Sequence, residues 1–94
     1  MLASNISILP LGQLLATPGA LSVLERNRVR LFDLIKRHQA GDWGDISPDD
    51  WAANDLAVEQ GGRILSAYLT AGGRFWVITE ADRSATTVLL PEEY

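Results

Sequence analysis

The feature that most constrains the fold of this 94-residue chain is a double glycine at positions 72 and 73, between two strand-like runs. The runs at 63–70 and 74–80 contain β-branched and aromatic residues, which favour strands. Glycine readily adopts the positive φ angles that tight hairpin turns require. We therefore predict a β-hairpin with a two-residue turn at the glycines, in a register that places Leu69 opposite Trp76.

A third strand is predicted for residues 86–90, which follow a polar loop and end at Pro91. Three strands joined by short turns form an antiparallel meander. Because the helix signals all precede these strands, the order of elements is typical of an α+β domain. We expect one domain over residues 1–94, in which N-terminal helices pack on a three-stranded antiparallel meander.

Capping residues and apolar spacing predict three helices. Thr17 followed by a proline begins a helix over 18–25, and Ser47 followed by a proline begins another that ends at the glycines 61 and 62. A middle helix over 28–39 has its leucines, Ile35 and His38 on one stripe. His38 is therefore expected to be a packed, hydrogen-bonded side chain.

Residues 1–16 are apolar, but Pro10 and Gly12 are among the residues that interrupt them. No basic region precedes the apolar one, as it would in a secretory signal, and the interruptions disfavour a membrane span. Proline also does not fit a central strand. We expect an extended arm or an edge strand here, and no membrane partner.

The composition excludes several kinds of catalytic and binding site. The chain has no cysteine, which excludes disulfides, thiolate metal sites and cysteine nucleophiles and fits a cytoplasmic location. A net charge of −4 and a pI near 4.7 give no general attraction to nucleic acid. A single histidine makes no zinc site, and no glycine-rich loop joins a strand to a helix. We expect no cofactor, no metal and no nucleic-acid partner.

The charged residues are unevenly distributed along the chain. Basic residues cluster between 26 and 37, whereas 38–62 contains no Lys or Arg and several aspartates, among them Asp42 and Asp45. The spacing of these aspartates is not that of a calcium-binding loop. The acidic segment is either a solvated face or a binding surface that imitates DNA phosphates and inhibits a nuclease.

Trp43 lies in a turn between Asp42 and Gly44. An exposed tryptophan in such a turn would be a contact hot spot for a partner. The alternative is an indole that folds back onto the core, and the sequence leaves both interpretations open.

A second cluster of candidate residues is expected at one end of the hairpin. The predicted register places Arg63 opposite Asp82, with Glu80 and Arg83 nearby. If the protein were a nuclease, Glu80 would take the 2′-hydroxyl proton and the two arginines would stabilise the phosphorane. The alternative is a set of ion pairs that holds the meander together.

Several stretches carry a resemblance to a known group of proteins. They are LGQ at 11–13, ATPGAL at 16–21, RHQAGDWGD at 37–45 and ITEADRSATTVLLPEEY at 78–94. With these stretches the chain resembles small bacterial plasmid-related proteins of mobile elements, some of which carry the label type I restriction subunit M. The chain has no Pro-Pro motif of the kind a methyltransferase uses. We therefore attribute that label to neighbouring genes.

The leading functional hypothesis is an accessory protein of a mobile element that acts by protein–protein contacts and self-associates. It rests on the absence of catalytic motifs and on residues 75–78, which are apolar on both faces of a strand. One alternative is a small ribonuclease or toxin, because helices followed by a sheet resemble the layout of barnase and RelE. The other is an acidic anti-restriction inhibitor.

Overall fold

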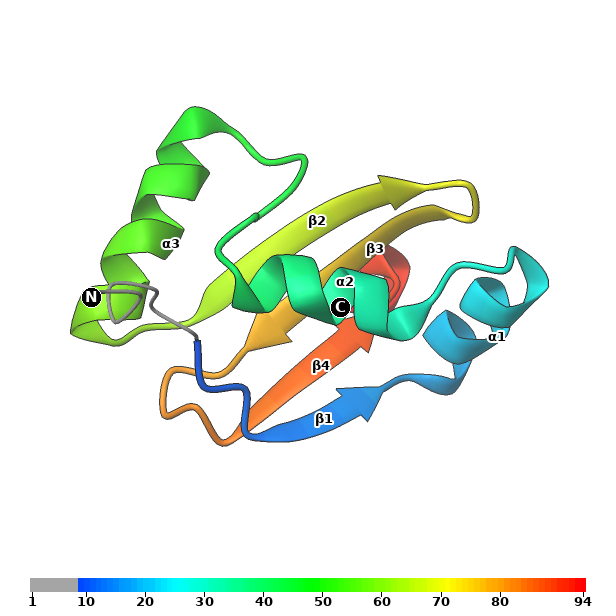
Figure 1. Cartoon of the computed structure of the whole chain (residues 1–94), viewed down its shortest axis with the longest axis horizontal. Coiled ribbons are helices and arrows are strands. Elements are labelled where there is room, and N and C mark those ends of the chain that lie inside the picture. Colours follow the sequence, from blue (N-terminus) through cyan, green and yellow to red (C-terminus); the bar gives the residue numbers. More distant parts are fainter. Residues whose placement is uncertain (1–8) are drawn as a thin grey trace, which may run out of the picture.

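The computed structural model describes residues 9–94. Its elements follow in the order β1 (Gln13–Ala16), α1 (Pro18–Arg26), α2 (Leu31–Gln39), α3 (Pro48–Gln60), β2 (Ile64–Thr70), β3 (Gly73–Thr79), β4 (Ala85–Leu89) and the 3₁₀ turn η2 (Pro91–Glu93) (Figure 1). The expected N-terminal arm is described only from Leu9 onward, and its first eight residues lie outside the described part.

The four strands form one mixed sheet in the order β1-β4-β3-β2. The predicted meander is present, since β2, β3 and β4 pair antiparallel. The prediction of a three-stranded, purely antiparallel sheet is wrong, because β1 adds to the edge of β4 in parallel orientation.

The expected edge strand is confirmed for Gln13–Ala16, because β1 is the outermost strand of the sheet beside β4. Its parallel pairing was not predicted, for two physical reasons. A pattern of four residues is too short to indicate a partner strand. The partner strand, β4, lies about seventy residues further along the chain, and no turn sequence between the two strands predicts that they pair. Gly12 has a φ of +63°, and an added Cβ would lie 2.3 Å from the carbonyl oxygen of Arg83. The backbone of Gly12 therefore lies against that of Arg83, at the point where β1 begins.

The hairpin register differs from the prediction by two residues. Thr70 pairs with Gly73, and Trp76 lies opposite Ala67 rather than Leu69. The turn is therefore formed by residues 71 and 72, because Gly73, with a φ of +103°, is the first residue of β3. A shift of two residues keeps the alternation of the two faces, so the same residues of β2 and β3 share a face in both registers.

The helices begin largely where capping residues predict. The hydroxyl of Thr17 accepts from the backbone N–H of Ala20, and that of Ser47 accepts from Asp50. The middle helix begins at Leu31, three residues later than predicted, because Arg28 has a positive φ of 55°. None of the helices within residues 9–94 is long and apolar enough to cross a bilayer.

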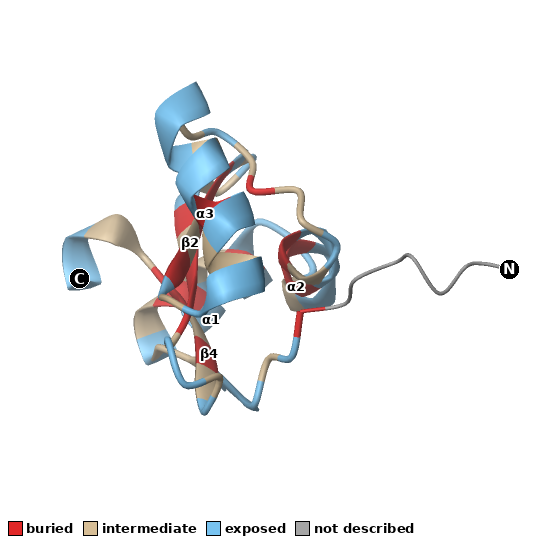
Figure 2. Ribbon diagram, turned by 90° about the vertical axis from the view of Figure 1, so that its left-hand side faces the viewer, coloured by how far each residue is buried: buried red, intermediate tan, exposed pale blue. Residues whose placement is uncertain are grey.

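The two faces of the sheet are covered unequally. Helices α1 and α2 pack on one face, where Tyr68, Phe75, Val77 and Val88 are fully buried. Figure 2 shows the sheet from its side, with α2 on one face and the C-terminal end of the chain on the other. On that second face the ring of Tyr94 packs edge-on against Trp76, with 5.3 Å between ring centroids. We call these the helix face and the η2 face.

Candidate functional site: the two edges of the sheet

Arg63 and Glu80 meet on the η2 face. Their side chains form an ion pair at 3.9 Å, and each is a little under half exposed. The Arg63 guanidinium also lies 5.0 Å from the centre of the Tyr94 ring and donates to the Tyr94 hydroxyl. Because of the shifted register, Arg63 faces Glu80 and not Asp82, as the sequence had predicted. The pair holds the last residue of the chain against the sheet.

Arg83 does not join this pair. Its guanidinium donates to the carbonyl oxygens of Gly62 at 2.6 Å, Ala57 at 2.8 Å and Glu80 at 3.2 Å. These carbonyls lie at the end of α3 and in the loop before β4, so Arg83 ties the two together. Because its Nη1 and Nη2 groups bind these carbonyls, Arg83 does not form one cluster with Arg63 and Glu80, which weakens the nuclease hypothesis.

Asp82 also has a local role. Its carboxylate accepts from the backbone N–H of Ser84 at 3.0 Å, which closes the turn before β4. The hydrogen bonds from Ser84 lower the pKa of Asp82, and the side chain is exposed. Its predicted role as a binding residue opposite Arg63 has no support in this geometry.

Trp43 folds back onto the core and retains only 1% of its surface. Its indole N–H donates to Asp55 at 2.9 Å, and its ring packs edge-on against His38 at 5.5 Å between centroids. The interpretation as an exposed contact residue is therefore excluded, and the alternative that the indole packs inward is confirmed.

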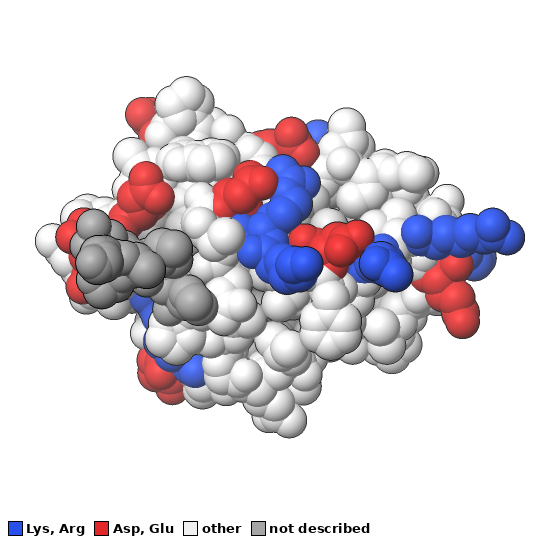
Figure 3. Space-filling view, viewed as in Figure 1, with Lys and Arg blue, Asp and Glu red and all other residues white. Residues whose placement is uncertain are grey.

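Asp42 holds the turn that follows α2. It pairs with Arg37 at 2.6 Å and accepts from the backbone N–H of Gly44 at 3.1 Å. The hydrogen bond from Arg37 lowers the pKa of Asp42. On the face that α2 covers, basic and acidic side chains lie interspersed (Figure 3), so this view shows no surface of a single sign that would resemble DNA.

The outer edge of β2 is closed by side chains and by a loop. Three residues of β2 have backbone groups that point away from β3, namely Leu65, Ala67 and Leu69. The Asn54 side chain donates to the Leu65 carbonyl at 2.8 Å and accepts from its N–H at 3.3 Å. An amide side chain with this geometry substitutes for the backbone of a neighbouring strand.

The loop before α3 continues the same protection along β2. The N–H of Ala67 donates to the Trp43 carbonyl at 3.1 Å, and its carbonyl accepts from Asp45 N–H at 2.6 Å. The Asp45 carboxylate then accepts from the N–H of Leu69 at 2.8 Å. Asp45, a predicted binding residue, therefore serves the fold, and five of the six outward groups of these β2 residues have a partner.

The outer edge of β1 is finished differently. The N–H groups of Gln13 and Thr17 donate inward to β4, at 3.0 Å each. Since backbone groups alternate in direction along a strand, those of Leu14 and Ala16 point outward. Within residues 9–94, no backbone hydrogen bond reaches these two residues from the outer side. Leu14 and Leu15 are each 44% exposed, on the helix face and the η2 face respectively.

A chain of buried hydrogen bonds links the two edge strands across the helix face. Nδ1 of His38 lies 2.6 Å from the Ser66 hydroxyl in β2, and Nε2 lies 2.8 Å from the Thr79 hydroxyl in β3. Thr79 contacts Thr86 at 2.7 Å, and Thr86 donates to the carbonyl of Leu11, just before β1.

The donors in this chain can be assigned from its last bond. Thr86 has one hydroxyl proton and gives it to a carbonyl, so Thr79 must donate to Thr86 and His38 must donate to Thr79 through Nε2–H. In the neutral imidazole, Nδ1 then accepts from Ser66. Burial lowers the pKa of His38 from 6.5 to about 4. The expectation of a packed, hydrogen-bonded histidine is confirmed.

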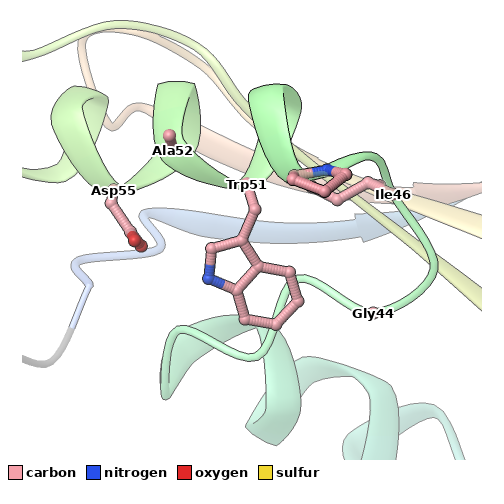
Figure 4. A pocket seen from close by; sticks show the side chains of 6 residues that line it. Gly44, Ile46, Trp51, Ala52 and Asp55 are labelled. Carbon is pink, nitrogen blue, oxygen red and sulfur yellow. The ribbon is translucent and has the colours of Figure 1, made fainter.

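A shallow groove of about 440 Å³ lies between α3 and the loop before it, and Gly44, Ile46, Trp51 and Asp55 are among the residues that line it. Figure 4 shows the Trp51 indole extending from α3 toward Gly44. The Asp55 carboxylate beside the groove already binds the indole of Trp43. The groove thus has few free polar groups, and residues 9–94 contain no cluster of three metal-binding side chains.

Comparisons of this chain with protein-family models, with curated proteins and with solved structures found no match. The candidate site therefore stands on geometry alone. Sequence reasoning missed its two main features, the Asn54 clamp and the open edge of β1. The one signal in the sequence for the clamp was Asn54 itself, a polar residue on the side of α3 that faces β2.

Proposed function

We propose that this protein is a non-catalytic accessory protein of a mobile element, and that it acts by binding an extended segment of a protein chain along the open edge of β1. The observation that carries the proposal is a contrast between two edges: the outward groups of β2 are engaged, whereas no backbone hydrogen bond from within residues 9–94 reaches those of β1. The resemblance to plasmid-related proteins supports the mobile-element part.

The engagement of the polar candidates argues against catalysis. Arg83 binds four backbone carbonyls, Asp42 and Asp45 hold the loop beside β2, and His38 is fully buried and neutral. Arg63 and Glu80 are each a little under half exposed, but they pair with each other and Arg63 holds Tyr94. An acid–base catalyst would need a free group of suitable pKa within reach of a substrate.

The edge of β1 has the chemistry that strand addition uses. A segment that pairs with β1 gains main-chain hydrogen bonds to Leu14 and Ala16, and its side chains meet the exposed leucines on either face. Proteins usually protect edge strands with lysine, proline or a bulge. Residues 13–16 contain none of these charged or cyclic residues.

Site-specific photo-crosslinking tests the proposal. A benzophenone amino acid replaces Leu14 in the full chain expressed in a bacterial host, and the same probe replaces Leu69 as the control on the closed edge. We expect adducts from position 14 in which mass spectrometry locates the crosslink in an extended segment of the partner. Ala16→Pro should abolish them, because proline removes an outward N–H and no inward bond. Equal adducts from position 69, or adducts that persist in Ala16→Pro, would contradict the proposal.

RNA integrity provides the test of the catalytic alternative. Expression of the wild-type protein and of Glu80→Ala should leave ribosomal and messenger RNA equally intact. Cleavage that requires Glu80 would instead establish the ribonuclease.

A further inference from the structure

We infer that the segment bound at β1 is β1 of a second copy of this chain, paired antiparallel about a two-fold axis that passes between the two Leu15 residues. The inference rests on the proposed function, and it names the partner. It predicts a closed dimer with one continuous sheet of eight strands.

Backbone geometry makes the edge complementary to itself. In an antiparallel pair, two opposed residues whose groups point toward each other exchange two hydrogen bonds. The outward residues of β1 are Leu14 and Ala16. A two-fold axis at Leu15 places Leu14 opposite Ala16 of the second copy, and the reverse pair follows by symmetry. All the outward groups of the two residues are then satisfied by four hydrogen bonds.

The side chains fit the same arrangement. Leu15 meets Leu15 of the second copy on the η2 face, where each is 44% exposed in the single chain. On the helix face, the exposed Leu14 meets the smaller Ala16 of the second copy, which leaves room for the leucine. Cross-strand apolar pairs of this kind stabilise sheets.

Charge favours a second copy over a charged partner strand. Residues 13–16 have no ionisable side chain, so the edge offers no charge to attract a basic or acidic segment. A second copy presents the same neutral residues, and no like charges become opposed in the interface. Self-pairing therefore meets no electrostatic penalty within the strands.

The closed edge of β2 explains why such an assembly would stop at two chains. Identical contacts about a two-fold axis use the β1 edge of both chains. The outer strands of the dimer are then the two β2 strands, where Asn54, Trp43 and Asp45 occupy five of the six outward groups of Leu65, Ala67 and Leu69. A third copy finds no free edge.

Sedimentation velocity of the full chain tests the inference over about 1 μM to 1 mM. Because the edge is only four residues long, we expect a dimer with a dissociation constant in the micromolar range. Leu15→Lys and Leu15→Glu each oppose two like charges at the axis and should weaken the dimer at least about tenfold. An equimolar mixture of the two variants should dimerise again, since opposite charges then meet. Leu69→Lys is the control, because Leu69 lies on the same face at the other edge and is 63% exposed.

The outcomes separate this inference from the proposed function. A wild-type chain that stays monomeric to 1 mM, or a dimer that Leu15→Lys leaves intact, overturns the pairing of two β1 strands. If crosslinks at position 14 then join another protein, the proposed function stands without the dimer. If position 14 gives no crosslink that depends on Ala16, both fail. Rescue by the mixed variants supports the two-fold register, because an unfolded or misfolded variant would not regain association.

Discussion

The two edge strands of this sheet differ in how their outward backbone groups are bonded. At β2, an asparagine from α3 and a loop of Trp43 and Asp45 occupy the outward backbone groups. At β1, which is four residues long, the backbone groups of Leu14 and Ala16 point away from β4, and no backbone hydrogen bond from within residues 9–94 reaches them. Leu14 and Leu15 are half exposed beside them. The comparison shows that an edge can be closed by side chains from outside the sheet, with no charged residue in the strand itself.

Under the proposed function, the same comparison assigns the binding role to one edge of the sheet. Closing β2 requires the loop between α2 and α3 and the start of α3, which together hold most of the acidic residues first taken as a binding surface. Asp42 and Asp45 therefore build the fold, and under the proposed function the neutral strand at the other side of the sheet binds the partner. Four measurements test this contrast.

The largest effect is expected from Gly44→Ala. An added Cβ would lie 2.2 Å from the carbonyl oxygen of Ala67, and the φ of Gly44 is +78°. The clash would push the loop away from β2, and we expect a loss of about 3 to 5 kcal/mol in the free energy of unfolding, measured by urea titration. Gly61→Ala is the matched control, since its φ is +84° but no atom lies within 4 Å. With a ψ of 151° it should cost about 1 to 3 kcal/mol, from backbone strain without the clash. Similar losses in both variants would show that the contact with Ala67 does not matter.

The second effect concerns the hydrogen-bond chain that joins the two edge strands. The folded pKa of His38, about 4, lies below its unfolded value of 6.5, so the unfolded state binds more protons between these values. Stability is therefore fully present above about pH 6.5 and is lost as the pH falls toward 4. The expected total loss is roughly 3 kcal/mol. The urea midpoint at a series of pH values measures it, and a profile in which His38→Gln keeps the same slope would refute the assignment to His38.

The third effect is expected from Asn54→Ala, which removes the clamp on Leu65. The N–H and carbonyl of Leu65 lose their partner at a site where Asn54 itself is only 7% exposed. We expect a loss of about 2 kcal/mol in unfolding free energy. Asn54→Asp keeps the acceptor for the N–H but opposes a carboxylate oxygen to the Leu65 carbonyl at a nearly buried site, so it should cost at least as much as alanine. If the alanine variant also forms species larger than a dimer, the clamp is what closes that edge.

The smallest effect on stability is expected from Leu15→Lys in the single chain. Because Leu15 is 44% exposed and no hydrogen bond of its side chain is lost, the unfolding free energy at sub-micromolar concentration should change by less than about 0.5 kcal/mol. The same variant should lose the dimer. A large loss of stability at low concentration would mean that Leu15 serves the core of the monomer and not an interface.

Local signals accounted for much of the architecture. Thr17 and Ser47 predicted the starts of α1 and α3, and the double glycine predicted the hairpin. The turn residues were wrong because either pair, 71–72 or 72–73, can form a two-residue turn, and only the packing of the strands decides between them. That shift of two residues moved Arg63 from Asp82 to Glu80.

Residues that are neighbours along the chain were enough to predict the starts of α1 and α3, the alternating strands of the meander and the burial of His38. Tertiary structure alone decided that β1 joins β4 in parallel, that Asn54 clamps β2 and that Arg83 binds the end of α3. These contacts join segments separated by 11 to more than 70 residues, and their geometry exists only once the chain has folded. The difference between the two sheet edges, on which the proposed function depends, belongs to this second group.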